Sequence, residues 1–219
     1  MTRRLVQLYG GLVLYGFSMA LMIESSLGLD PWDVLHEGLA KRLPVSFGVV
    51  VIAVGALVLL AWIPLWQRPG LGTVSNVVVI GLAVDASAYV LPEPDAVVVR
   101  ALFLVAGVLL NGVATAAYIG ARFGPGPRDG LMTGLVRTSG RSVRLVRTTI
   151  ELSVLGTGWL LGGTVGVGTV LYAVAIGPLV HLLLPRLTVP ASTTGPEGVR
   201  GGGHGDGHGD GRPVGVQPR

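Results

Sequence analysis

Six apolar stretches follow one another along the chain, and each is a candidate for a membrane-spanning helix. They cover residues 5–24, 46–66, 73–91, 97–119, 145–162 and 169–184. A helix needs about 20 predominantly apolar residues to cross the hydrocarbon core of a bilayer. The last two stretches are the shortest, and a glycine-rich segment separates them. The pattern predicts an all-α polytopic membrane protein with six transmembrane helices.

The same pattern occurs twice. When the sequence is shifted by 96 residues, residues 5–91 lie over residues 101–187 without a gap, and roughly 26 of the 87 overlaid positions are identical. Self-similarity at a fixed offset indicates an internal repeat. We predict a first repeat over residues 1–96 and a second over residues 97–187. With three spans each, the two repeats insert with opposite orientation, as in many secondary transporters.

Composition agrees with a membrane location. Half of the residues are hydrophobic, 13% are charged, and the chain has no cysteine, which excludes disulfides and thiolate metal sites. Mean hydropathy is +0.67, too high for a soluble domain of this length. Residues 188–219 differ, because they are rich in Gly, His and Asp. We predict that they form a disordered cytoplasmic tail.

Basic residues are divided unequally between the two sides of the predicted membrane. Only Lys41, Arg42 and Arg100, of 16 Lys and Arg residues, fall on one side. Cytoplasmic segments carry the excess of positive charge, so both termini are predicted to be cytoplasmic. The pI of about 10.0 reflects this bias and an attraction to anionic lipids, and nucleic acid is not a predicted partner.

A Pro-x-Asp segment follows the first span of each repeat. Pro31 and Pro127 suit the first position of a helix, and Asp33 and Asp129 would accept hydrogen bonds from first-turn amides. Each segment predicts a helix of about three turns, either amphipathic at the interface or re-entrant toward a central cavity. Arg128 takes the place of Trp32 in the second repeat, and it would either bind an anion at the helix start or anchor the inner surface.

Several polar residues fall inside the apolar stretches. Asp85 lies about 18 Å along its helix from the start at Thr73, well inside the hydrocarbon, where an ionisable group marks a functional site. Glu151 is a second such acid, and Arg147 would alternatively pair with it. The spans also hold two asparagines whose default role is hydrogen bonding between helices, Asn76 and Asn111.

Other motifs point to structure. The sequence Gly-x-Gly-Thr, at 70–73 and 166–169, opens the third span of each repeat and predicts a tight turn with a capping Thr. It lacks the Lys and the spacing of a phosphate-binding loop. The chain also shows no HExxH motif and no Ser-His-Asp order. Neither an enzyme nor a metal or cofactor is predicted.

The chain resembles the YczE/YyaS/YitT-type bacterial integral membrane proteins, closest to the YczE-like branch. The resemblance covers about residues 3–187 and rests on the segments 27–35, 70–73 and 124–132 with Asn76, Asp85 and Glu151. It implies a multi-pass protein of a bacterial plasma membrane and is compatible with a small exporter. It supplies no substrate and no catalytic residue.

Together these observations predict a secondary transporter that exports a small organic or anionic compound, with protons as the coupling ion. The alternative is a non-transporting accessory or scaffold protein that docks a partner or anionic lipid through its Arg-rich inner segment. The expected partners are the lipid bilayer and an unknown substrate, and a homodimer is left open. Candidate substrate-binding residues are Arg128, Asp33, Asp129, Asn76 and Asn111, and candidate proton-coupling residues are Asp85 and Glu151.

Overall fold

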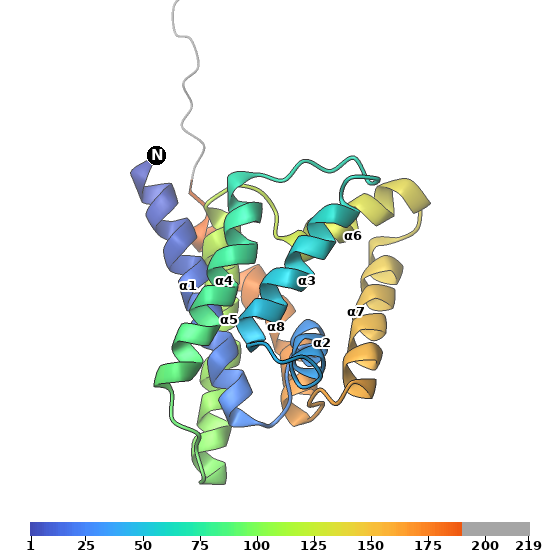
Figure 1. Cartoon of the computed structure of the whole chain (residues 1–219). Coiled ribbons are helices and arrows are strands. Elements are labelled where there is room, and N and C mark those ends of the chain that lie inside the picture. Colours follow the sequence, from blue (N-terminus) through green and yellow to red (C-terminus); the bar gives the residue numbers. More distant parts are fainter. Residues whose placement is uncertain (190–219) are drawn as a thin grey trace, which may run out of the picture. The chain divides into compact units, whose positions relative to one another are not determined.

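The structure is a computed structural model, and it describes residues 1–189. In this part of the chain there are eight α-helices and no strand (Figure 1). The predicted tail lies almost wholly outside the described residues. The helices are α1 (Thr2–Ser25), α2 (Pro31–Ala40), α3 (Phe47–Ala61), α4 (Leu71–Val90), α5 (Val97–Gly120), α6 (Pro127–Ser139), α7 (Val143–Leu160) and α8 (Val167–Leu187).

Four of these helices are long and apolar enough to cross a membrane, namely α1, α4, α5 and α8. The other two predicted spans correspond to α3 and α7. The helix α3 is apolar but has 15 residues, about 22 Å of rise, which is less than the hydrocarbon thickness of about 30 Å. The helix α7 has 18 residues and contains Arg144, Arg147 and Glu151. The all-helical class is therefore confirmed for residues 1–189, and four of the six predicted spans are helices long and apolar enough to cross a membrane.

The two short helices predicted from the Pro-x-Asp segments are present as α2 and α6, with Pro31 and Pro127 at their first positions. Serine caps the helix that follows each of them. The side chain of Ser46 accepts a hydrogen bond from Val49 N, and that of Ser142 accepts one from Leu145 N, both at 3.3 Å. A serine at the N-cap satisfies a first-turn amide that the helix leaves free.

The most extensively packed pair of helices in residues 1–189 is α1 and α5, which run antiparallel (Figure 1). The helix α4 packs on α1, and α8 packs on α5. The short helix α2 packs on α7 in the lower half of the view, whereas α6 contacts α3 in the upper half. Helices at equivalent places in the 96-residue overlay therefore have equivalent neighbours.

Close contacts between the two halves repeat the overlay at the level of single atoms. Gly72 N donates to Phe123 O at 2.9 Å, and Gly168 N donates to Leu27 O at 2.8 Å. In the overlay Gly72 corresponds to Gly168 and Leu27 corresponds to Phe123, so the two hydrogen bonds are equivalent. The loop glycines beside them, Gly28 and Gly124, have φ of 114° and 118°, a conformation that favours glycine. At both Gly-x-Gly-Thr motifs the first glycine, Gly70 or Gly166, is the N-cap of the helix, and the threonine hydroxyl at the third helical position accepts a hydrogen bond from the amide of that glycine.

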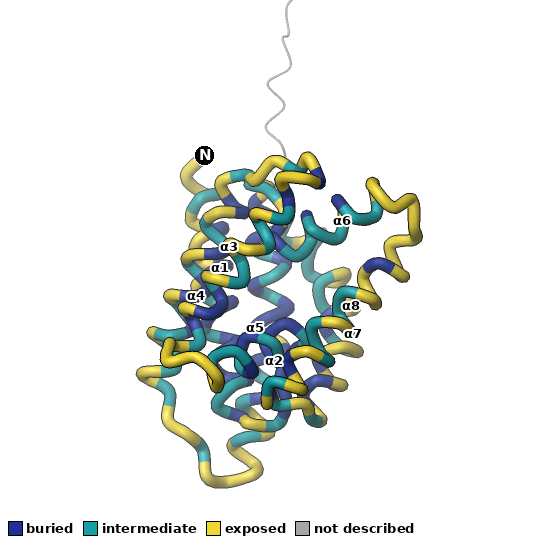
Figure 2. The backbone as a smooth tube through the Cα atoms, turned by 45° about the vertical axis from the view of Figure 1, so that its right-hand side comes forward, coloured by how far each residue is buried: buried dark blue, intermediate teal, exposed yellow. Residues whose placement is uncertain are grey.

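Burial agrees with this arrangement. Buried positions face the middle of the bundle, and exposed positions lie on its outer faces and loops (Figure 2). Many exposed side chains are large and apolar, including Leu57, Leu82, Leu102 and Val174. Such a surface suits contact with lipid tails and not with water.

The two halves differ in the packing of α3 and α7, which are equivalent in the overlay. The helix α3 packs along α4, whereas α7 has no comparable contact with α8. The space left beside α7 belongs to a central cavity.

Candidate functional site

A cavity of about 440 Å³ lies in the middle of the bundle, and every one of the eight helices contributes to its wall. Much of the wall is aliphatic, from α3, α4 and α8. The polar part includes the first turns of α2 and α6, residues of α7, three tyrosines, and Asn76, Thr115 and His181. A largely apolar cavity with a few convergent polar groups is the usual form of a small-molecule site.

Arg128 is the central polar residue of this cavity. It extends from the first turn of α6 to the first turn of α2, where Nη1 lies 3.4 Å from Asp30 Oδ1 and Nη2 lies 3.7 Å from Asp33 Oδ1. Its guanidinium also lies over the Trp32 ring, 5.2 Å from the centroid, within cation–π range. Arg128 and Trp32 occupy equivalent positions of the overlay, so the two helix starts meet at this point.

Asp30, and not Asp33, caps α2. Its Oδ1 accepts hydrogen bonds from Trp32 N at 2.9 Å and from Asp33 N at 3.4 Å. Asp33 lies instead 3.1 Å from His36 Nδ1. The expectation that Asp33 caps the helix is therefore wrong, because a carboxylate three residues earlier already accepts those amides.

The two carboxylates at the start of α2, Asp30 and Asp33, are buried. Asp30 is 1% exposed and Asp33 is 0% exposed. Burial raises the pKa of Asp30 to about 7, with the neighbouring Asp33 acting in the same direction and Arg128 opposing both. Burial and Arg128 lower the pKa of His36 to about 3. His36 is therefore neutral at pH 7, and it shares a hydrogen bond with Asp33.

Asp129 forms a second acidic point on the cavity wall. The hydroxyl of Tyr118 on α5 donates to Asp129 Oδ2 at 3.3 Å. Burial raises the pKa of Asp129 as well. Thus the predicted binding residues Arg128 and Asp129 both line the cavity, and Asp33 reaches it through Arg128.

The two predicted asparagines have different surroundings. Asn76 lies on the cavity wall. Asn111 is buried between helices, where its Nδ2 donates to Ser18 Oγ at 3.0 Å and its Oδ1 accepts from the Tyr172 hydroxyl at 3.0 Å. Asn111 therefore orients Tyr172, which itself lines the cavity.

The two predicted proton-coupling acids are also separated. Glu151 lines the cavity on α7 and pairs with Arg147, whose Nε lies 2.8 Å from Oε1. Asp85 is not part of the wall. It accepts hydrogen bonds from Ser46 Oγ at 2.5 Å and Gly48 N at 2.7 Å, so it holds the start of α3 against α4.

Sequence reasoning misses the most enclosed acid of the cavity wall. Asp30 is the N-cap of α2, and the same carboxylate also faces the cavity and Arg128. The overlay contains the signal, because Gly126 stands at the equivalent position. The three cavity tyrosines carry no local signal, since they come from three spans far apart in sequence. They are Tyr15, Tyr118 and Tyr172.

A helical bundle with an apolar outer surface and buried charges around one central cavity is the design of an integral membrane protein. Comparison with known proteins gives the family: residues 2–185 match the family of unknown function DUF6198, to which this chain belongs. An uncharacterized protein of Haemophilus influenzae is 40% identical over 173 residues, 79% of each chain.

Two proteins of Bacillus subtilis are further relatives. The uncharacterized membrane protein YczE is 33% identical over 181 residues, 81% of this chain and 84% of its own. The uncharacterized protein YyaS is 25% identical over 182 residues, 81% of this chain and 90% of its own. The predicted YczE-like family is thus confirmed, and this chain is a membrane protein. No solved structure matches it.

Proposed function

We propose that this protein is a secondary transporter that moves a small organic compound through the central cavity, with export as the direction. The observation that carries the proposal is the cavity itself, which is lined by residues of all eight described helices and holds a charged cluster where α2 and α6 meet. Ionisable groups enclosed within a membrane protein are costly, and they usually mark a substrate or ion pathway.

The architecture we propose is a pair of inverted three-span repeats, α1–α4 and α5–α8, with α3 and α7 as the additional spans. Equivalent helices α1 and α5 run antiparallel, and equivalent glycine contacts recur with the halves exchanged. A substrate site at the interface of such repeats is the common arrangement in secondary transporters. In this arrangement α2 and α6 are re-entrant helices whose first turns meet at the cavity.

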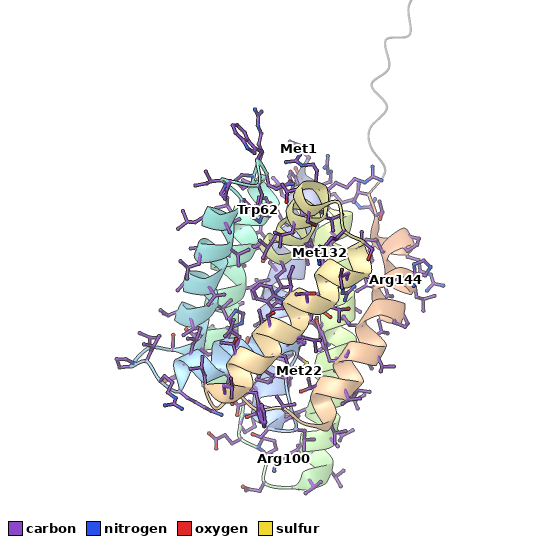
Figure 3. The ribbon with its side chains drawn as sticks, turned by 90° about the vertical axis from the view of Figure 1, so that its right-hand side faces the viewer. Met1, Met22, Trp62, Arg100, Met132 and Arg144 are labelled. Carbon is purple, nitrogen blue, oxygen red and sulfur yellow. The ribbon has the colours of Figure 1, made fainter. Side chains whose placement is uncertain are left out.

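The proposed orientation in the bacterial plasma membrane rests on the two ends of the bundle. Arg4 binds the carbonyl oxygens of Ala121 and Arg122 at the N-terminal end. Arg100 binds the carbonyl of Ser25 at the opposite end, and Figure 3 shows Met1 and Arg100 far apart along the bundle. The arginine-rich end, with the N-terminus, is proposed to be cytoplasmic.

The contacts suggest a role for each residue of the site. Arg128, Asp129 and Asn76 are proposed to contact the substrate, because their side chains line the cavity. Asp33 and Asn111 are proposed to position Arg128 and Tyr172. Glu151 remains a proposed coupling residue on the wall. Asp85 stays a prediction in that role, and its contacts with the start of α3 favour a structural one.

The accessory or scaffold function keeps one specific observation in its favour. Arg141 and Arg144 are exposed on the connection from α6 to α7 and the first turn of α7, where they would be available to a partner or to anionic lipid. A scaffold protein does not need to open its cavity first to one side of the membrane and then to the other. A transporter must expose the cavity alternately to the two sides of the membrane.

That difference can be tested without knowing the substrate. The chain has no cysteine, so Met132→Cys on the cavity wall (Figure 3) would carry a unique thiol. We expect a membrane-impermeant maleimide to label it in both right-side-out and inside-out vesicles. Asp95→Cys, in the exposed connection between α4 and α5, is the control that should react from one side only. Labelling of Met132→Cys from a single side would contradict transport and favour the scaffold.

A further inference from the structure

Two oxygen atoms in the cavity cluster are buried without a partner. Within residues 1–189, Asp30 Oδ2 and Asp33 Oδ2 are the buried side-chain atoms that make no hydrogen bond. Asp30 is 1% exposed and is also part of the cavity wall. Burying a carboxylate oxygen without a partner is costly. The cluster therefore lacks a positive group or a proton.

The charges around the cluster lead to the same conclusion. Arg128 is the one guanidinium in contact with Asp30 and Asp33 among residues 1–189, and Asp129 is a third carboxylate beside it on α6. Arg147 does not correct this excess, because it is paired with Glu151 on its own helix. When all groups are ionised, acid outnumbers base at the meeting point of α2 and α6. A buried excess of negative charge is relieved by protonation or by a cation.

The rest of the wall is suited to an organic cation. Tyr15, Tyr118 and Tyr172 line the cavity together with Trp32, and aromatic faces attract positive charge. Trp32 already shows this behaviour with the guanidinium of Arg128. The aliphatic wall from α3 and α4, to which Val51 and Ile80 belong, would accept the apolar part of the same molecule.

We propose that the cavity binds an organic cation at Asp30, and that the cation and a proton compete for this carboxylate. When the cation binds, the O–H bond of the neutral acid breaks and the proton leaves to water, so the charge of the site is unchanged. Exchange of the cation for a proton across the membrane would drive export of the cation. The exchange step depends on the proposed transport function, whereas the competition at Asp30 does not.

The groups that face Asp30 permit this competition near neutral pH. On its own helix these are Asp33 and neutral His36, and from α6 Arg128. The phenol of Tyr15 on α1 and that of Tyr172 on α8 close the cavity around them. Burial raises the pKa of Asp30 to about 7, so a proton is present in acidic solution and absent in alkaline solution.

Calorimetry on the purified full-length protein tests the competition with two probes of fixed charge. Benzyltrimethylammonium is a permanent cation, and benzenesulfonate is an anion of similar size. We expect the cation to bind and the anion not to bind. Below about pH 6, the affinity for the cation should fall about tenfold per pH unit, with about one proton released per cation bound, as measured in two buffers of different ionisation enthalpy.

Substitution locates the effect. Asp30→Asn should abolish cation binding and proton release, and it keeps the fold because Asn caps a helix as well as Asp. The matched control, Asp95→Asn at an exposed acid, should bind as the parent does. Binding of benzenesulfonate alone, binding independent of pH, or unchanged cation binding by Asp30→Asn would each overturn the proposal. Proton-linked cation binding without flux in proteoliposomes would refute the transport function and leave the cation site standing.

Discussion

The first turns of α2 and α6 occupy equivalent positions in the two halves, but they bring different side chains to the cavity. In the first half, Asp30 and Trp32 bring a buried carboxylate and an aromatic ring to the cavity, whereas Gly126 and Arg128 stand in their places in the second. Deeper in the same helices, glycine contacts match across the halves. The difference separates positions that hold the two halves together from positions that give the cavity its chemistry.

The matched contacts are expected to give the largest effects. A side chain at Gly158 would meet the backbone of Val34 and Leu35 in α2, and one at Gly130 would meet the ring of Trp62. The two contacts are equivalent in the 96-residue overlay, because Gly158 corresponds to Trp62 and Gly130 corresponds to Val34. We expect Gly158→Ala to lower the free energy of unfolding by about 3 kcal/mol, since backbone cannot move aside, as measured by denaturation in detergent.

A rescue experiment sharpens this prediction. Gly130→Ala should cost less in a Trp62→Leu background than in the parent, because a side chain causes that clash, whereas no side-chain change at Val34 should reduce the cost of Gly158→Ala. Gly156→Ala is the control, since nothing lies within 4 Å of the added methyl group, and it should be neutral or slightly stabilising. Equal losses in Gly156→Ala and Gly158→Ala would show that α2 and α7 do not pack as described.

An intermediate effect is expected at the unmatched position Arg128. Arg128→Gln leaves Asp30 and Asp33 without their cation, which should lower the free energy of unfolding by about 2 kcal/mol at pH 8. This loss is below the usual cost of breaking a buried ion pair, because the Arg128 side chain is 31% exposed. The loss should be smaller at pH 5, where protonation relieves the carboxylates. A loss that does not depend on pH would mean that Arg128 acts by packing alone.

The smallest effect is expected at Asp85, whose equivalent is His181. Asp85→Ala removes an acceptor from the start of α3 and should lower the free energy of unfolding by about 1 kcal/mol. The pH dependence of cation binding should be unchanged. If that pH dependence were lost while stability was kept, Asp85 would be a coupling residue as the sequence predicts.

Asp85 shows where sequence reasoning ends. Its position along an apolar helix is readable from the chain, but the partner that uses its carboxylate, the start of α3, comes from a different helix and is set by tertiary packing. The helices and the short Pro-initiated segments depend on neighbouring residues and were predicted correctly, whereas the helices at the Gly-x-Gly-Thr motifs have the first glycine, and not the threonine, as their N-cap. Four of the six predicted spans are long apolar helices within the described residues, and α3 is shorter than its apolar run because it ends at Ala61 although that run continues.

The cavity shows the same limit. Arg128 stands out in the sequence because it breaks the overlay, and Asp129 because it preserves it. The acidic excess around Arg128 could not be predicted, since it requires α2 and α6 to meet at their first turns. Local pattern therefore identifies many of the groups, and only the packing of the two halves shows which of them share a cavity.

The central claim is that the two halves face opposite sides of the membrane around one cavity. Leu43 and Ser139 are equivalent positions just after α2 and at the end of α6, and both are exposed. Leu43→Cys and Ser139→Cys, each the unique thiol of its chain, can be labelled with an impermeant maleimide in intact cells. We predict that Leu43→Cys reacts in intact cells and that Ser139→Cys reacts only after permeabilisation. Reaction of both from the same side would contradict the inverted arrangement.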